Sequence, residues 1–214
     1  MKEISTVFNY IKNPTEIYAR SFEIIRTEVD FSKLPKSAHA IATRIIHSCG
    51  MPEIVNDLMI TENFAATTKK ALANAKPIFV DAEMVRHGII ARQLVNQNEI
   101  ICTLNDPAAR EIGIAKSITR SAAALELWTE KLEGAIVVIG NAPTALFALL
   151  EMIDAGGPMP ACIVGMPVGF VGAAESKAEL IANPRGIPFA TIKGRKGGSA
   201  VASSVINALT SDNQ

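Results

Sequence analysis

The sequence predicts an α/β fold, in the form of a three-layer α/β/α sandwich around a mainly parallel, doubly wound sheet. The 214 residues are 49% hydrophobic and 20% charged, which is typical of a globular protein with one substantial core. Apolar runs of strand length are continuous rather than alternating, as in a sheet that is covered on both faces. Segments of helix length separate these runs, which favours parallel strands joined by helices. We therefore expect a single domain over residues 1–214.

Residues 1–50 are predicted to form a helical amino-terminal segment that packs on the α/β core. The first helix has one apolar side, formed by residues three or four apart, which are Tyr18, Phe22, Ile25 and Val29. Thr15 is the expected N-cap of this helix. A second helix is expected to begin near Pro35 and Ser37 and to end at Gly50.

Strands and helices alternate after residue 50. Strands are expected at 78–81, 99–103, 135–140, 161–165 and 188–192. Helices are expected at about 62–75, 119–132, 143–154, 174–182 and 198–209. Together these elements predict a flavodoxin-like sheet, in which ligands bind beyond the carboxyl ends of the strands. The loops that follow the strands are therefore the expected place of a functional site.

The composition argues against several classes of protein. Lys and Arg total 21 and Asp and Glu total 21, so no net charge is available to hold nucleic acid regardless of its sequence. The uncharged stretch 135–150 is interrupted by Gly140 to Pro143, so strand, turn and helix describe it better than a membrane span. Three isolated cysteines form neither a disulfide framework nor a zinc-binding spacing, and no apolar signal segment follows Met1. We therefore expect a cytoplasmic protein that binds neither nucleic acid nor membrane.

Three loops that lead into helices contain residue types typical of anion-binding sites. These loops span 119–121, 141–144 and 194–199, and Arg120, Arg195 and Lys196 add positive charge to them. Free N–H groups and the helix dipole bind carboxylates or phosphates at a helix N-terminus, although ordinary helix capping uses the same residues. Both glycine patterns of nucleotide-binding loops are missing from the sequence. A polyanionic small molecule other than a nucleotide is therefore favoured.

Two further loops follow predicted strands. The segment 165–176 contains Gly165, Gly169 and Gly172, which would let the backbone approach a bulky ligand or form a tight turn. Asp81 and Glu83 follow the strand 78–81, where they would contact a ligand or cap a loop.

His47 is the candidate proton carrier. It lies near the end of the second predicted helix, and Arg44 lies three residues earlier on nearly the same face. An imidazole beside a cation at the edge of a core loses its proton readily, which suits a residue that must donate and accept a proton near neutral pH. A purely structural helix histidine is the alternative. Cys49 projects to nearly the opposite side of the helix, so a Cys/His nucleophile pair is improbable.

Several long strings of the sequence are unusual and occur in a defined order. They are IYARSFEIIRTEVD, RIIHSCG, DAEM, EIICTLNDP, TRSAAALELW, IGNAPTALFALLEM, GMPVGFVGAAESK and GIPFATIKGRKGGSA. In these strings, and over nearly its whole length, the chain resembles the family of precorrin-8X methylmutase and cobalt-precorrin-8 methylmutase, also called precorrin isomerase. The resemblance implies an isomerase of cobalamin biosynthesis that moves a methyl group from carbon 11 to carbon 12 of a tetrapyrrole. It would convert precorrin-8X to hydrogenobyrinate, or cobalt-precorrin-8 to cobyrinate.

The resemblance also implies roles for individual residues. The histidine of the H-x-C-G string, which is His47 here, would be the proton donor and acceptor. Ser21 and Arg44 would contact the substrate, and Arg120 would clamp one of its side-chain carboxylates. No cofactor is implied, since cobalt, where present, is part of the substrate. A homodimer with active sites near the subunit boundary is expected.

Two alternatives belong to other functional classes. A non-catalytic tetrapyrrole carrier of the same fold would use the same anion-binding loops, and it would bind the corrin product equally well without His47. A nucleotide-binding enzyme of the Rossmann type is disfavoured by the missing glycine patterns and would be detected by titration with dinucleotides.

Overall fold

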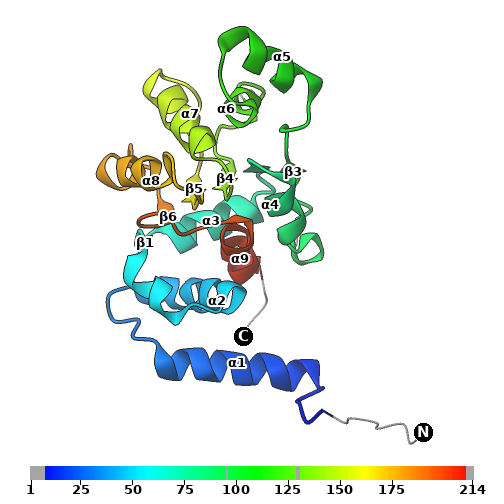
Figure 1. Ribbon diagram of the computed structural model, residues 1–214, viewed down its shortest axis with the longest axis vertical. Helices are drawn as coiled ribbons and strands as arrows, with labels where there is room; N and C mark the ends of the chain where they lie inside the picture. Colours follow the sequence, from blue (N-terminus) through cyan, green and yellow to red (C-terminus); the bar gives the residue numbers. More distant parts are fainter. Residues whose placement is uncertain (1–7, 95, 129–130, 211–214) are drawn as a thin grey trace, which may run out of the picture.

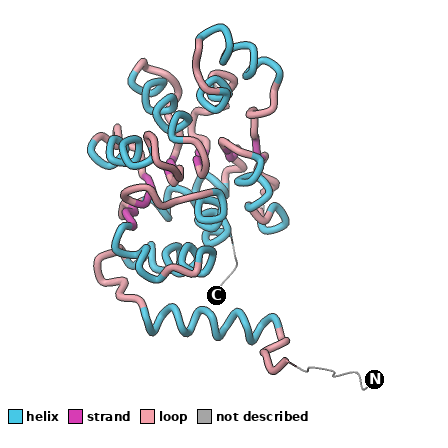
Figure 2. The backbone as a smooth tube through the Cα atoms, viewed as in Figure 1, coloured by secondary structure: helices cyan, strands magenta, loops and turns pink. Residues whose placement is uncertain are grey.

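The computed structural model describes residues 8–94, 96–128 and 131–210. It is a mixed α/β structure built on a six-stranded sheet (Figures 1 and 2). The strands are β1 Leu58–Ile60, β2 Ile78–Val80, β3 Ile100–Ile101, β4 Ile136–Ile139, β5 Cys162–Gly165 and β6 Phe189–Ile192. Their order in the sheet is β1-β6-β5-β4-β2-β3, and every pair of neighbours is parallel except β1 and β6.

The parallel strands confirm the predicted doubly wound sheet. Counted along the chain without β1, they lie in the order 2-1-3-4-5, which is the flavodoxin-like order. The strand order reverses between β2 and β4, the position where ligands bind in folds of this type. The sequence analysis missed β1, because a strand of three residues is too short to show a pattern. Leu58 of β1 pairs with Ile192 of β6 in antiparallel register.

Helices cover both faces of the sheet, as expected for a three-layer sandwich. One face carries α2 His39–Cys49, α3 Phe64–Ala73, α4 Glu83–Gly88 and α9 Ser199–Thr210 (Figure 1). The other face carries α6 Arg120–Leu125, α7 Pro143–Asp154 and α8 Ala173–Ala182, with α5 Pro107–Lys116 packed on α6. Single turns of 3-10 helix lie at Lys36–Ala38 and Ala91–Gln93, and a longer one at Pro52–Asp57.

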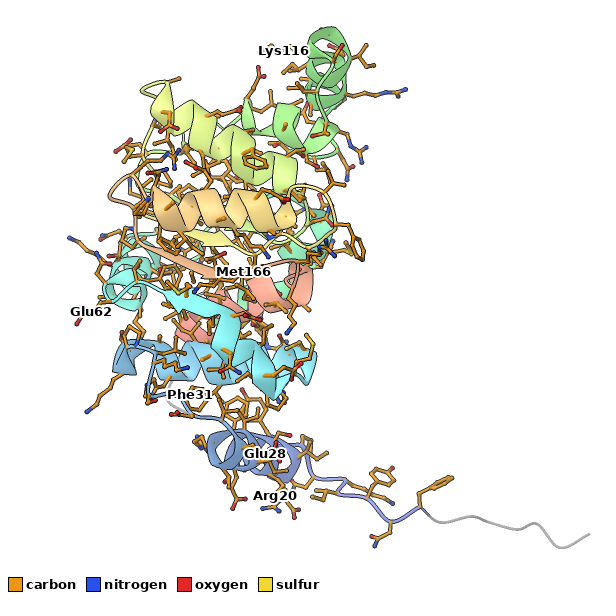
Figure 3. The ribbon with its side chains drawn as sticks, turned by 60° about the vertical axis from the view of Figure 1, so that its left-hand side comes forward. Arg20, Glu28, Phe31, Glu62, Lys116 and Met166 are labelled. Atoms are coloured by element: carbon orange, nitrogen blue, oxygen red, sulfur yellow. The ribbon has the colours of Figure 1, made fainter. Side chains whose placement is uncertain are left out.

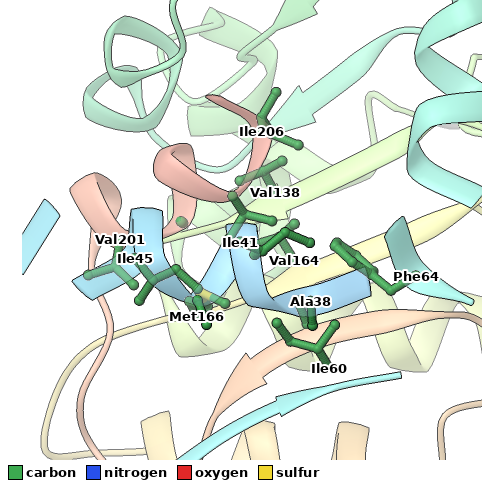
Figure 4. Close-up of a cluster of buried hydrophobic side chains, with 14 of the residues drawn as sticks. Ala38, Ile41, Ile45, Ile60, Phe64, Val138, Val164, Met166, Val201 and Ile206 are labelled. Carbon is green, nitrogen blue, oxygen red and sulfur yellow. The ribbon is translucent and has the colours of Figure 1, made fainter. Parts of the chain in front are cut away.

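Each face of the sheet has its own buried core, because successive strand residues point to opposite sides. Val138 packs with the first group of helices and Val137 with the second. Figure 4 shows the first core, in which Ile45 of α2 lies in one cluster with Val164 of β5 and Val201 of α9. The β-branched and apolar strands found in the sequence are thus buried on both sides.

Helix α1, Pro14–Glu28, lies against the outer side of α2, away from the sheet (Figures 1 and 3). Its predicted apolar stripe is confirmed, since Ile25 is buried and Tyr18 and Phe22 are half-buried. The predicted cap at Thr15 is wrong, because Asn13 accepts the N–H of Glu16 at 3.1 Å. Proline has no N–H and suits the first helical position, so Pro14 fixes the helix start directly after Asn13.

The predicted end of α2 is confirmed, and the predicted end of α6 is wrong. Gly50 ends α2 in the left-handed conformation, with φ of 67°, as expected. Helix α6 ends at Leu125 instead of 132, although 129–130 of that prediction lie outside the described residues. The chain leaves the helix there because Trp128 turns inward, packs 4.9 Å from the Phe79 ring and donates its indole N–H to a threonine hydroxyl at 2.8 Å.

Helices α4 and α5 were not predicted. Both are short and carry weak apolar patterns, and Asp106 caps α5 by accepting the N–H of Ala108 at 2.9 Å.

Over the described ranges, no helix has the length and apolar character needed to cross a bilayer.

Candidate active site

His47 lies in the last turn of α2 and is exposed on the side that faces α1. Its ring contacts two aromatic rings of α1, with centroid distances of 5.4 Å to Tyr18 and 5.3 Å to Phe22, both in an edge-on arrangement. Tyr18 and Phe22 are one helical turn apart, and their centroids are 4.3 Å apart. These edge-on contacts position the imidazole, and its nitrogens make no hydrogen bond to any other described residue. Because His47 is exposed, these nitrogens are open to solvent or to a ligand.

Arg44 is the charged neighbour of His47. Its guanidinium carbon lies 5.3 Å from the centroid of the Tyr18 ring, a cation–π contact on the same aromatic pair. Partial burial lowers the pKa of His47 below its usual value of 6.5, and the positive charge of Arg44 lowers it further. Burial also lowers the pKa of Arg44, whose ordinary value is 12.5. The imidazole is therefore mostly neutral at pH 7, in agreement with the direction expected from the sequence.

Ser21 lies on the same side of α1 as the aromatic pair, three residues after Tyr18 and half-buried. Its hydroxyl donates to the carbonyl of Ile17 at 2.8 Å, which leaves its oxygen able to accept a hydrogen bond. A groove of about 480 Å³ opens beside the aromatic pair, lined by Pro14, Thr15, Tyr18, Ala19, Phe22 and Arg26. The structure thus places Arg44 and His47 against the aromatic pair of α1, and Ser21 on the same side of α1 as that pair. Figure 3 shows Arg20 on the outer side of α1.

Arg120 lies elsewhere. It is the first residue of α6, on the opposite face of the sheet from α1 and α2 (Figure 1). There it lines a separate hollow of about 550 Å³ with the start of α5, including Asp106 and Arg110. Within one chain, Arg120 and His47 therefore do not share a site.

Two of the three predicted anion-binding loops are occupied by the chain itself. At 119–121, the Thr119 hydroxyl caps α6 by accepting the N–H of Ala122 at 3.2 Å, which is ordinary capping. At 141–144, the ligand is the carboxylate of Asp81, which accepts the N–H groups of Gly140, Asn141 and Ala142 at 2.8, 2.9 and 2.7 Å. Of the two interpretations left open for these loops, capping by the chain's own side chains is the one observed at both, and a carboxylate bound by the Arg120 side chain stays a prediction.

Asp81 follows β2 and joins it to the loop after β4, at the point where the strand order reverses. It is 2% exposed, and this burial raises the pKa of its carboxyl group, against the opposing effect of the three amide donors. The position that binds nucleotides in many doubly wound folds is thus filled by an internal carboxylate. Of the two roles considered for Asp81, the structure supports the loop cap.

Residues 16–211 match the family model described as precorrin-8X methylmutase. The chain belongs to the precorrin-8X methylmutase family. It is 48% identical to a precorrin-8X methylmutase of Sinorhizobium sp over 94% of this chain and 96% of that protein. A cobalt-precorrin-8 methylmutase of Methanothermobacter thermautotrophicus is 38% identical over 91% of each chain. A solved structure of the precorrin-8X methylmutase from Thermus thermophilus is similar with a TM-score of 0.81 and 33% identity, covering 92% of this chain and 94% of that one.

This methylmutase is accordingly an isomerase, and the comparisons place it at the methyl migration step of cobalamin biosynthesis. The predicted fold, enzyme class and family are thereby confirmed. The residue roles implied by resemblance stay predictions, but three of the four residues, Ser21, Arg44 and His47, lie at one place in the fold.

The sequence analysis missed two aromatic residues of the methylmutase that contact His47 and one buried lysine outside this site. Tyr18 and Phe22 were predicted only as part of the apolar side of the first helix, and the structure shows that they contact His47; their spacing as an aromatic pair one turn apart was the available signal. Lys177 of α8 is buried, and its ammonium group donates to the carbonyl of Lys196. Its position on the inward face with Ala173 and Leu180 could have been read from the helical spacing.

Proposed function

We propose that this methylmutase moves a methyl group from carbon 11 to carbon 12 of a precorrin-8 macrocycle, with His47 as the proton donor and acceptor. The observation that carries the proposal is an exposed imidazole with a lowered pKa, packed against two aromatic rings of α1 and with no hydrogen bond from either nitrogen to another described residue. The family relationship supplies the reaction class.

The chemistry requires a reversible proton carrier. Substrate and product of a methylmutase are isomers, so a proton that is taken from the macrocycle must return to it within the same cycle. A neutral imidazole accepts a proton from the ring system and the resulting imidazolium gives it back, which is general acid and base catalysis by one group. The proton transfer stabilises the tautomer in which a suprafacial [1,5] methyl shift extends the conjugation. No external methyl donor and no cofactor take part in this scheme.

Arg44 and Ser21 act as substrate contacts in this proposal. The guanidinium of Arg44 pairs with one of the carboxylates that edge the macrocycle, and the Ser21 hydroxyl accepts or donates a hydrogen bond nearby. Arg44 also keeps the imidazole deprotonated between turnovers, because its charge disfavours the imidazolium. A bound carboxylate would offset that charge and raise the proton affinity of His47 when substrate is present.

We further propose that the enzyme is a homodimer with active sites near the subunit boundary. Arg120 cannot reach His47 of its own chain, so its role as a carboxylate clamp requires the Arg120 of a second chain. Two apolar side chains on α1 support such a contact, since Ile17 is 44% and Ile24 is 40% exposed. Light scattering that gives the mass of two chains would support the dimer, and a monomer at micromolar concentration would refute it.

The proposed substrate is metal-free precorrin-8X, because the relative of that name is 48% identical and the relative named for the cobalt form 38%. We propose that the reaction takes place in the cytoplasm and that no nucleic acid or membrane takes part.

The test is incubation of the enzyme with metal-free precorrin-8X and, separately, with cobalt-precorrin-8, followed by visible spectroscopy. The proposal expects a change of the spectrum to that of hydrogenobyrinate, and faster conversion of the metal-free substrate. Binding of hydrogenobyrinate without any conversion of either substrate would identify a carrier and refute the proposed activity. Faster conversion of the cobalt form would refute only the choice of substrate.

A further inference from the structure

Two glycine-rich loops at the carboxyl edge of the sheet take no part in the site described above. Loop 166–172 follows β5 and loop 193–198 follows β6, and these strands are parallel neighbours. The sequence analysis singled out segment 165–176 for glycines that would let the backbone approach a bulky ligand, and 194–199 as an anion-binding loop.

The two loops are joined to each other. Gly198 donates its N–H to the carbonyl of Met166 at 2.9 Å, and Gly169 donates to the carbonyl of Arg195 at 3.4 Å. A side chain at Gly197 would overlap the carbonyl oxygens of Met166 and Pro167, so the loops touch backbone to backbone. They therefore form one surface rather than two independent loops.

Buried and paired charges hold loop 193–198 from below. The ammonium group of Lys177, fully buried in α8, donates to the carbonyl of Lys196. The backbone carbonyl of Asp57 accepts the N–H of Lys193 at 2.8 Å, and the Asp57 carboxylate lies 3.5 Å from the ammonium of Lys196. A surface that is held in this way is formed before ligand binds and loses little freedom on binding.

The outer side of this joined surface is apolar and cationic. Phe170 is 83% and Val171 89% exposed, although both are large hydrophobic residues. The guanidinium carbon of Arg195 lies 5.4 Å from the centroid of the Phe170 ring. In the part of the chain that the structure describes, no carboxylate pairs with Arg195.

The surface lies close to the end of α2, which carries His47. Met166, at the start of the first loop, belongs to the same buried cluster as Ile45, two residues before His47 (Figure 4). Burial raises the pKa of the Cys49 thiol, two residues after His47, and the charge of Lys196 opposes that rise. The loops and the proton carrier thus flank the same helix end.

We propose that loops 166–172 and 193–198 form a second substrate-contact surface of the methylmutase, in which Phe170 packs against the face of the macrocycle and Arg195 binds one of its peripheral carboxylates. This inference rests on the proposed function, which supplies the tetrapyrrole. An aromatic face and a guanidinium suit a conjugated ring edged by carboxylates, and here these two groups are already in cation–π contact.

The charges favour a tetrapyrrole over a second copy of this chain as the occupant. A symmetric dimer formed through this surface would place the same residues of both chains against each other. Lys193, Arg195 and Lys196 would then face their own counterparts, and like charges repel. The carboxylates of the macrocycle complement the same three cations.

The experiment compares the variants Phe170→Ala and Arg195→Ala with the wild-type enzyme. Met159→Ala and Arg92→Ala serve as matched controls, because Met159 is partly exposed before β5 at the opposite edge and Arg92 is exposed in the turn Ala91–Gln93. The measurements are the Kd for hydrogenobyrinate by spectroscopic titration at low and high salt, KM and kcat with precorrin-8X, and the mass in solution.

We expect each of the two variants to raise Kd and KM roughly 10-fold, as the loss of one buried side chain or one charge-assisted contact does, with kcat within about twofold of wild type. The Kd of Arg195→Ala should also depend less on salt. Unchanged Kd values in both variants would overturn the proposal. A rise in Kd together with loss of the dimer would also overturn it, because it would show that the surface is a subunit contact. Wild-type enzyme that binds hydrogenobyrinate but converts no precorrin-8X would refute the proposed function alone, because the Kd comparison still tests the surface.

Discussion

Asp81→Asn tests whether an internal carboxylate holds the loop at the point where the strand order reverses. One carboxylate oxygen accepts the N–H of Gly140 at 2.8 Å, and the other accepts those of Asn141 and Ala142 at 2.9 and 2.7 Å. An asparagine keeps only one acceptor oxygen, so its amide NH₂ must face at least one of these donors. The site is 2% exposed, so water does not replace the lost acceptor.

The expected cost follows from the number of donors left without an acceptor. One buried N–H without a partner costs about 1–3 kcal/mol, and the remaining bonds lose the extra strength of an ionised acceptor. Removal of the buried charge offsets part of this cost, so we expect the free energy of unfolding to fall by about 2–3 kcal/mol. For a chain of this size that corresponds to a melting temperature lower by roughly 4–12 °C.

The assay is thermal unfolding followed by circular dichroism, with Asp106→Asn as the matched control. Asp106 is also a carboxylate that accepts a backbone N–H, but it caps the exposed start of α5, where asparagine is an equally good cap. The control should therefore melt close to wild type. The reasoning is refuted if Asp81→Asn and Asp106→Asn have the same melting temperature.

Two other perturbations test charges at and away from the site. Arg44→Met removes a charge that lowers the pKa of His47, so the acid limb of the plot of kcat/KM against pH should move to higher pH. Arg44→Lys keeps the charge and should leave the acid limb near its wild-type position. An acid limb that does not move in Arg44→Met would show that Arg44 does not act on His47. Arg185→Ala breaks the pairs to Asp154 at 2.6 Å and Glu179 at 2.9 Å, and it should lower the melting temperature at pH 7. Arg185 lowers the pKa of both carboxyl groups, so their stabilisation is present above their usual values of 3.8 and 4.5 and is lost as pH falls through the lowered values. The difference in melting temperature between the variant and wild type should therefore shrink as pH falls below 3.8.

The sheet and most helices could be predicted because their signals are local. Continuous runs such as Ile136–Ile139 and Cys162–Gly165 are buried on both faces, and that burial is visible in the composition of the run. Strand β1 could not be found in this way, because its three residues take their conformation from pairing with β6, more than a hundred residues later. Its antiparallel direction is likewise set by tertiary pairing.

The candidate site was predictable in part. The spacing of Arg44 and His47 places them on one face of a helix, and the lowered pKa of His47 follows from that spacing and from partial burial. The tertiary structure decides which element packs against a helix face, so the contacts of His47 with Tyr18 and Phe22 could not be derived from the sequence. The same holds for Arg120, whose separation from His47 by the sheet no local pattern indicates.

For a related reason, the sequence did not reveal that the chain's own side chains bind the amide groups of two predicted anion-binding loops. Residue types at a helix start predict that amide groups will bind an anion, but they do not say which anion. At 141–144 the anion is Asp81, which lies sixty residues earlier in the chain and reaches the loop only because β2 and β4 are neighbours. Local chemistry was therefore predicted correctly, and the identity of the ligand was set by the fold.

The role of His47 as the proton carrier is tested most directly by single-turnover conversion of precorrin-8X with excess enzyme. His47→Ala is compared with His87→Ala, a control at an exposed histidine of α4 whose side chain is 78% exposed. We predict that His47→Ala slows methyl migration by about 10²-fold or more, while the Kd for hydrogenobyrinate and the melting temperature stay near wild type, and that His87→Ala converts normally. Migration at the wild-type rate in His47→Ala would contradict the assignment of proton transfer to that imidazole.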